Sequence, residues 1–147
     1  MFVVDTNVLV YAANLDARER AICMARLEQW QRQHTAWYLT WGIVYEFCRV
    51  VTHGRALKHP LTASEAWSFV SAVMAAPGVR VLTHGPSHLA IAAALATEVS
   101  LLRGNLVFDA HTVALMREHG IRRIWTRDAD FYRFPGIEVL DPLREDI

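Results

Sequence analysis

The sequence is poor in lysine, in cysteine and in long apolar runs. Lys58 is the only lysine among fifteen basic residues, and fifteen acidic residues bring the formal net charge to zero. This balance argues against a strongly basic nucleic-acid-binding module. It does not exclude a phosphate ligand, because the other basic residues are arginines, which bind phosphate in a bidentate manner. Cys23 and Cys48 are too few for a disulfide scaffold, so we expect buried, reduced thiols.

No apolar run is long enough to cross a membrane. The longest weakly polar stretch, around residues 88–96, is too short to span a bilayer. The N-terminus lacks the basic leader of a signal peptide and reaches Asp5 at once. We therefore expect a cytoplasmic protein without membrane contact. Its 147 residues, 53% of them apolar, predict a single domain over residues 1–147 with a substantial core.

Short β-like segments alternate with helical ones along the chain. The expected strands are Phe2–Val4, Thr35–Thr40, Val79–Leu82, Arg122–Trp125 and Ile137–Leu140. The expected helices run from Asp16 or Ala17 to His34 and over Trp41–Thr52, Leu61–Ala76, Pro86–Leu101 and Asn105–His119. Five strands separated by helices are typical of βαβ units. The sequence thus predicts an α/β fold with a mostly parallel sheet and helices on both of its faces.

Four acidic residues follow or lie close to the predicted strand ends. Asp5 comes directly after the first strand, and Asp128 follows the strand that ends near Trp125. Glu46 lies on the helix after the second strand, and Asp109 lies about one turn inside its helix. Ligands of open α/β sheets bind beyond the carboxyl ends of the strands. The four acids are therefore expected to meet at one edge of the sheet.

Such a group of carboxylates needs a cation to remain ionised. Two carboxylates about 4 Å apart repel by about 4 kcal/mol at an effective dielectric constant of 20. Oxygen-only ligands favour Mg²⁺ or Mn²⁺. These ions polarise a phosphoryl oxygen, lower the pKa of a bound water and stabilise a leaving oxygen. The pattern therefore indicates hydrolysis of phosphodiester bonds.

Each acid also has a structural interpretation. Asp5 is a possible N-cap of a helix that begins at Thr6. Glu46 can pair with Arg49 one turn later, and Asp109 can interact with the helix dipole. The sequence TRDADF favours a turn around Asp128, with Asp130 as a turn residue.

Four blocks in a fixed order resemble one known family. They are VDTNVLVYA at the start, YEFCRV around Glu46, GNLVFDAHTVALMREHG around Asp109 and WTRDADFYRFPGIEVLDP near the end. In this order they resemble the PIN-domain family and, within it, the VapC-type toxins of toxin–antitoxin pairs. The resemblance covers nearly the whole chain.

The resemblance implies an α/β/α sandwich and an Mg²⁺- or Mn²⁺-dependent ribonuclease that leaves 5′-phosphate and 3′-hydroxyl ends. By position, the catalytic and metal-binding acids are Asp5, Glu46, Asp109 and Asp128. Asn7, Thr126 and Asp130 match positions that support these acids or their waters. The implied partners are an RNA substrate, a cognate antitoxin and a second copy of the chain.

Two features of the predicted site stay open. Glu46 is the favoured group to orient the attacking water, and it is expected to reach the metal either directly or through a water molecule. Whether a second metal ion joins the site only when substrate binds also stays open.

Three other functions compete with a toxin ribonuclease. A PIN nuclease without an antitoxin, acting in RNA processing, would have the same acids. A phosphatase of the haloacid dehalogenase type would open with D-x-D, whereas here Asn7 stands in the place of the second aspartate. A non-enzymatic interaction protein would not need all four acids.

Basic and aromatic residues add weaker signals. His84 and His88 have a zinc-binding spacing, but the Gly85–Pro86 pair between them argues against a shared helix, and without further ligands we expect capping or surface roles. His111 is expected to point away from Asp109 on its helix.

The roles of two further sets of residues, one aromatic and one basic, stay open. Trp37, Tyr38 and Trp41 are expected to serve the core, a subunit interface or base stacking. The arginines near the C-terminal block suit RNA phosphates or a solvated face. They are Arg122, Arg123, Arg127 and Arg133.

Overall fold

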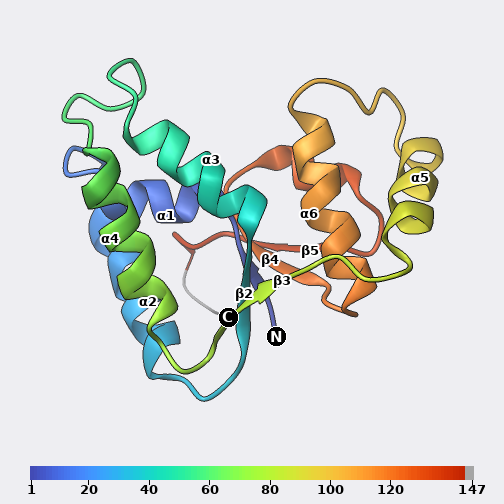
Figure 1. The fold of residues 1–147 in the computed structure, drawn as a ribbon, viewed down its shortest axis with the longest axis horizontal. Helices are drawn as coiled ribbons and strands as arrows, with labels where there is room; N and C mark the ends of the chain where they lie inside the picture. The colour runs from blue at the N-terminus through green and yellow to red at the C-terminus, as the bar shows by residue number, and fades with distance from the viewer. Residues whose placement is uncertain (145–147) are drawn as a thin grey trace.

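The computed structural model of the protein describes residues 1–144 and has a sheet of five parallel strands at its centre (Figure 1). The strand order is β3-β2-β1-β4-β5, and every neighbouring pair is parallel. The strands are β1 (Val3–Val4), β2 (Trp37–Thr40), β3 (Val79–Leu82), β4 (Arg123–Trp125) and β5 (Glu138–Leu140). The five predicted strands are confirmed, and the sheet is parallel throughout.

Helices cover both faces of this sheet. In Figure 1, α1, α2 and α4 lie on one side of the strands and α5 and α6 on the other, while α3 contacts both α1 and α6. The helices are α1 (Thr6–Ala13), α2 (Arg20–Arg32), α3 (Trp41–Val51), α4 (Ala63–Met74), α5 (His88–Glu98), α6 (Leu106–Glu118) and the 3-10 helix η1 (Ala129–Arg133). The predicted α/β fold with helices on both faces is confirmed.

The helices are shorter than predicted, and the difference is largest for α2 and α5. Residues before Arg20 form turns, in which the Arg20 N–H donates to the carbonyl of Ala17, so α2 starts later than its sequence pattern suggests. Pro86 lies in a turn before α5, and α5 ends at Glu98, ahead of Leu101 with its positive φ of 56°. The alanine-rich sequence of α5 thus predicts the helix but not the residues at which it begins and ends.

The start of α4 agrees with the sequence. The Glu65 N–H donates to the Thr62 hydroxyl, and the Glu65 carboxylate accepts from the Thr62 N–H, so that the two residues form a capping box. Such caps contribute about 1 kcal/mol to the stability of a helix.

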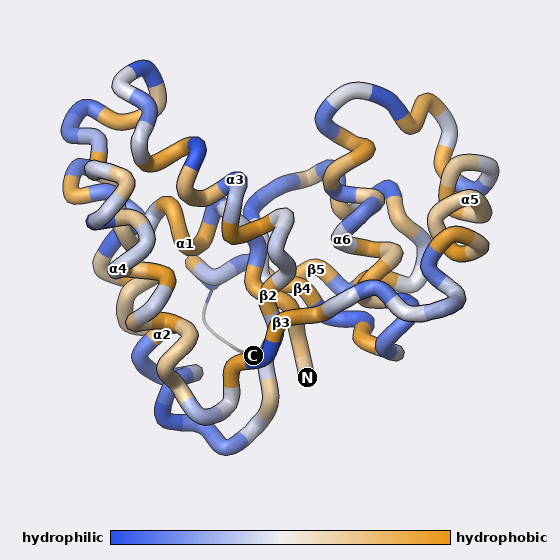
Figure 2. The backbone as a smooth tube through the Cα atoms, viewed as in Figure 1, coloured by the Kyte–Doolittle hydropathy of each residue, from blue (hydrophilic) through white to orange (hydrophobic). Residues whose placement is uncertain are grey.

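The core lies between the sheet and its helices. Figure 2 shows hydrophobic residues concentrated in the central strands, and both residues of β1 are fully buried. Phe2, Trp30, Trp37 and Trp125 form one aromatic cluster, which confirms a core role for Trp37. Within residues 1–144, no helix has the length and apolar character needed to cross a membrane.

Candidate active site

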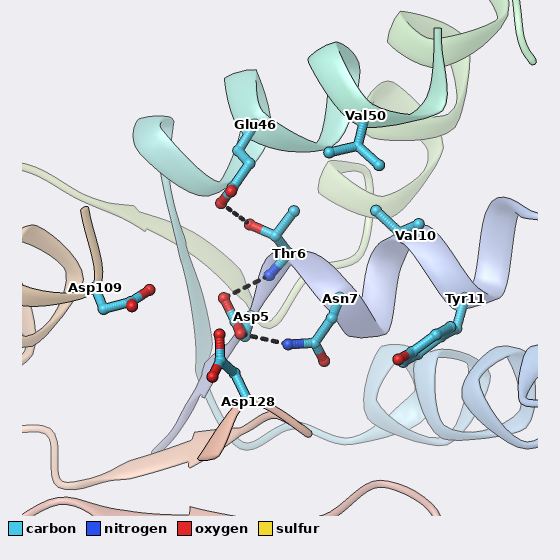
Figure 3. Close-up of a pocket in the computed structure, with 9 residues that line it drawn as sticks. All are labelled: Asp5, Thr6, Asn7, Val10, Tyr11, Glu46, Val50, Asp109 and Asp128. Carbon is cyan, nitrogen blue, oxygen red and sulfur yellow. Dashed lines mark hydrogen bonds between the residues drawn. The ribbon is translucent and has the colours of Figure 1, made fainter. Parts of the chain in front are cut away.

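Asp5 is the only residue between β1 and α1. Its Oδ1 accepts a 2.7 Å hydrogen bond from the Thr6 N–H and so caps the helix. The structural interpretation of Asp5 as an N-cap is therefore confirmed. The capping bond uses only one of the two carboxylate oxygens of Asp5. The carboxylate lies at the carboxyl edge of the sheet, in the centre of Figure 3.

The other oxygen of Asp5 joins two distant segments. The Thr126 hydroxyl, just beyond β4, donates to Asp5 Oδ2 over 2.6 Å, and Asn7 Nδ2 donates to the same oxygen over 2.6 Å. Asn7 Nδ2 also lies 2.8 Å from Thr126 Oγ1, and the Arg127 N–H donates to Asn7 Oδ1. Asn7 and Thr126, predicted to support the acids, thus hold Asp5 directly.

Glu46 reaches the same edge of the sheet from α3. Its Oε2 accepts a 2.8 Å hydrogen bond from the Thr6 hydroxyl, while its Oε1 lies 3.7 Å from Arg49. Thr6 therefore contacts Asp5 through its N–H and Glu46 through its hydroxyl. The role of Thr6 was not predicted from the sequence, although a hydroxyl beside Asp5 at a strand end is a usable signal.

The four predicted acids line one cavity. Asp5, Glu46, Asp109 and Asp128 surround a space of about 250 Å³, together with Thr6 and other residues. Figure 3 shows their carboxylates directed toward this common space from α3, α6 and the ends of β1 and β4. The expected meeting of four distant segments at one sheet edge is what the structure shows.

Asp128 and Asp130 form the start of η1. Asp128 Oδ1 accepts from the Asp130 N–H over 2.9 Å, so the predicted turn is present. The Asp128 N–H in turn donates to the Thr126 hydroxyl. Carboxylate oxygens of Asp109, Asp128 and Asp130 lie within 4.8 Å of one another, which brings Asp130 within reach of a shared cation.

Burial, and after it the crowding of these acids, changes their protonation. Burial raises the pKa of Asp5 to about 6, although the hydrogen bonds from Thr126 and Thr6 oppose the rise. Burial also raises the pKa of Asp109 to about 7, and the negative charges of neighbouring acids, Asp128 first among them, add to the effect. The site therefore holds protons that a cation would displace.

These residues fit a hard divalent cation. The donors are carboxylate oxygens, which Mg²⁺ and Mn²⁺ prefer. Burial, and after it the charges of the neighbouring acids, raise the pKa values of Asp5 and Asp109, so a cation in the cavity would favour their ionised forms. The cavity also leaves room for the water molecules that Mg²⁺ retains.

The C-terminal arginines mostly serve intramolecular contacts. Arg123 pairs with Glu138 over 2.9 Å, Arg127 pairs with Glu19 over 3.2 Å, and Arg133 donates to a backbone carbonyl. These contacts favour the interpretation as a structural, partly solvated face.

The structure adds a third histidine to the pair found in the sequence. His84 and His88 do not share a helix, as expected, but His111 of α6 lies beside both. Sequence spacing did not reveal this third histidine, because it comes from a separate helix.

The sequence matches the model of the PIN domain over residues 2–137. The chain belongs to the PIN-domain family. Among curated relatives, this PIN domain is 36% identical over 138 residues to ribonuclease VapC48 of Mycobacterium tuberculosis, with 94% of each chain covered. The family and the fold expected from the four sequence blocks are thus confirmed.

Solved structures of low sequence identity share the fold. The crystal structure of Mycobacterium tuberculosis VapC20, described as a sarcin–ricin loop cleaving toxin, is 19% identical with a TM-score of 0.65 and covers 90% of this chain and 93% of its own. VapBC2 from Rickettsia felis, bound to a DNA fragment from its promoter, is 17% identical with a TM-score of 0.64, with 95% and 96% covered.

Proposed function

We propose that this PIN-domain protein is a divalent-metal-dependent endoribonuclease and the toxin of a toxin–antitoxin pair. The observation that carries the proposal is the convergence of Asp5, Glu46, Asp109 and Asp128 on one cavity. The raised pKa values of Asp5 and Asp109 support it, because they indicate a site built for a cation. The similarity to a relative named as a ribonuclease supports RNA as the substrate.

The metal in this proposal is Mg²⁺ or Mn²⁺. Asp5, Asp109 and Asp128 would hold it, with Glu46 as a direct or water-mediated ligand and Asp130 as a supporting acid. When bound, it supplies a Lewis acid for the scissile phosphate and lowers the pKa of a bound water.

The protein side chains orient the attacking water and the metal ligands. Glu46 is placed to orient the attacking water, because the Thr6 hydroxyl holds Oε2 and leaves part of the carboxylate directed into the cavity. Asn7 and Thr126 keep Asp5 in one position through two hydrogen bonds to Oδ2. A fixed ligand set of this kind avoids reorganisation during the reaction.

The proposal includes partners and context. We expect one PIN-like domain over residues 1–147, an antitoxin protein that neutralises the activity, a homodimer and a cytoplasmic site of action on cellular RNA. The two-component VapBC2 complex of similar fold is consistent with an antitoxin partner. Trp41, Tyr45 and Trp67 form an exposed aromatic row beside the site that suits a protein interface.

Mapping of RNA 5′ ends after induction tests the proposal. New 5′-monophosphate ends are expected with the wild-type protein and are expected to disappear with Asp109→Ala. Asp5→Ala serves as a second inactive variant, and circular dichroism checks that both variants fold. Equal cleavage by wild-type and both variants would refute the proposed site. Cleavage without growth arrest would instead favour an RNA-processing nuclease.

A further inference from the structure

Three histidines from separate segments meet beside α6. His84 lies in the connection between β3 and α5, His88 is the first residue of α5, and His111 lies in α6. Each offers a ring nitrogen, and the three nitrogens lie within 4.8 Å of one another. The ring centroids are 4.3 to 5.8 Å apart.

The ring of His111 is oriented by its surroundings. Its Nδ1 faces Gly42 of α3, where an added Cβ would come within 3.2 Å of this nitrogen. Its Nε2 lies 2.9 Å from Nε2 of His84. Two nitrogens of the same kind can share one proton at this distance, or both can turn their lone pairs to a common cation.

A carboxylate orients the third ring. Nδ1 of His88 lies 3.2 Å from Oε2 of Glu118, whose side chain is only 8% exposed. The carboxylate packs closely on Gly85, because a Cβ there would come within 2.6 Å of Oε1. A carboxylate on Nδ1 leaves Nε2 of the same ring as the metal-binding nitrogen, and it strengthens that nitrogen as a ligand.

We propose that His84, His88 and His111 bind a borderline divalent ion, Zn²⁺ or one of similar preference such as Co²⁺, with Glu118 as the outer partner of His88. Three imidazoles suit Zn²⁺, whereas Mg²⁺ prefers the oxygen ligands of the acidic cavity. The two sites would therefore select different metals by ligand chemistry. This inference does not depend on the proposed ribonuclease activity.

The geometry requires only a small adjustment. Zinc–nitrogen bonds of about 2.0–2.1 Å place two nitrogens of a tetrahedral site about 3.3 Å apart. His84 and His111 would separate by a few tenths of an ångström, which the exposed His84 can provide. Three protein ligands leave a fourth position to water. The ion would fasten the β3–α5 connection and the start of α5 to α6, the helix that carries Asp109.

Zinc titration by calorimetry tests this site. The protein is used without a histidine tag, stripped of metal by a chelator and held in excess MgCl₂, so that Mg²⁺ competes at the acids. One equivalent of Zn²⁺ is expected to bind, and Co²⁺ is expected to give the visible absorption of a tetrahedral nitrogen site. His84→Ala and His88→Ala are expected to weaken zinc binding at least tenfold, and Glu118→Gln about tenfold.

Two variants serve as matched controls. His53→Ala removes an exposed histidine outside the cluster, and Asp109→Asn alters the acidic cavity. Both are expected to bind Zn²⁺ with the wild-type affinity. Unchanged binding by His84→Ala and His88→Ala, loss of binding in Asp109→Asn, or no saturable binding by the wild type would each overturn the proposal.

Discussion

The hydroxyl of Thr126 donates a 2.6 Å hydrogen bond to Oδ2 of Asp5 and so joins the end of β4 to the end of β1. Thr126 is 1% exposed and Asp5 is 7% exposed, so water does not compete for this bond. The same hydroxyl accepts from Asn7 and from the Asp128 N–H. One side chain thereby fixes the relative positions of two proposed metal ligands.

Replacement of this hydroxyl should therefore affect both stability and metal binding. Thr126→Val keeps the shape of the side chain, removes one of the two hydrogen bonds to Oδ2 of Asp5, and leaves the Asp128 N–H without this acceptor. We expect a loss of about 1–3 kcal/mol in the free energy of unfolding, together with weaker Mg²⁺ binding and slower RNA cleavage. Urea denaturation and Mg²⁺ titration measure these effects.

Thr97→Val is the matched control for this substitution. The Thr97 hydroxyl donates to the carbonyl of Ala94 at an exposed position of α5, and Thr97 is not among the residues that line the acidic cavity. Its replacement is expected to leave cleavage unchanged. Wild-type Mg²⁺ affinity in Thr126→Val would contradict the positioning role of Thr126.

The stability of the metal-free protein should fall as the pH rises from about 4 to about 7. Folding raises the pKa of Asp5 from 3.8 to about 6 and that of Asp109 from 3.8 to about 7. In this window the folded chain binds more protons than the unfolded chain, so the free energy of unfolding decreases with pH. For the buried Asp5 the full loss, reached above pH 7, is about 3 kcal/mol.

Asp109→Asn isolates one of these contributions. It removes the titrating group and the repulsion from Asp128, so the metal-free variant is expected to be more stable than the wild type at pH 8 and to lose cleavage. Urea denaturation from pH 4 to pH 8 measures the slopes, with Asp16→Asn as an exposed control. Identical pH dependence in wild type and Asp109→Asn would exclude this origin of the effect.

Mg²⁺ should stabilise the protein more at pH 8 than at pH 5. At pH 8 the acids of the cavity are ionised, whereas at pH 5 Asp5 and Asp109 hold protons that the ion must displace. An ion present at a hundredfold excess over its dissociation constant adds about 2.7 kcal/mol. Thermal unfolding with and without MgCl₂ measures the gain. Equal gains at both pH values would argue against binding at these two acids.

The acid site was predictable from the sequence because strand ends determine it. Asp5 and Asp128 follow β1 and β4, which are neighbours in a parallel sheet, so their carboxylates arrive at the same edge. The sequence pattern also places Glu46 and Asp109 near this edge, but their assignment as ligands came from the family resemblance, because the faces of α3 and α6 that reach the edge depend on how the helices pack.

Other features could not be derived from spacing. The contact between Thr6 and Glu46 joins residues forty positions apart across two helices, and the histidine cluster depends on the path of the β3–α5 connection. The ends of α5 were also misjudged, because alanine favours helix at every position while the turn at Pro86 and the positive φ of Leu101 lie outside it.

Glu46 and Arg49 allow the catalytic and structural interpretations of Glu46 to be separated. The pair is exposed and 3.7 Å apart, so it contributes less than about 1 kcal/mol. Glu46→Gln is expected to lower kcat for RNA cleavage about 10²–10⁴-fold, because it removes the group that orients the water. Arg49→Gln breaks the same ion pair and is expected to retain cleavage. Equal loss in both variants would favour a purely structural role for Glu46.

The exposed aromatic row of Trp41, Tyr45 and Trp67 allows a test of the proposed homodimer. Trp41 contacts Tyr45, which in turn contacts Trp67, and Tyr45 also lines a cavity with Asp5 and Glu46. If this row forms the homodimer interface, Trp41→Ala should convert a dimer to a monomer in light scattering, because exposed aromatic side chains contribute strongly to interfaces.

Tyr132→Ala removes another exposed aromatic side chain, on η1, and is the matched control that should leave the mass unchanged. A Trp41→Ala protein of unchanged mass with weakened RNA binding would assign Trp41 to base stacking instead, because a stacked base contributes about 1–3 kcal/mol.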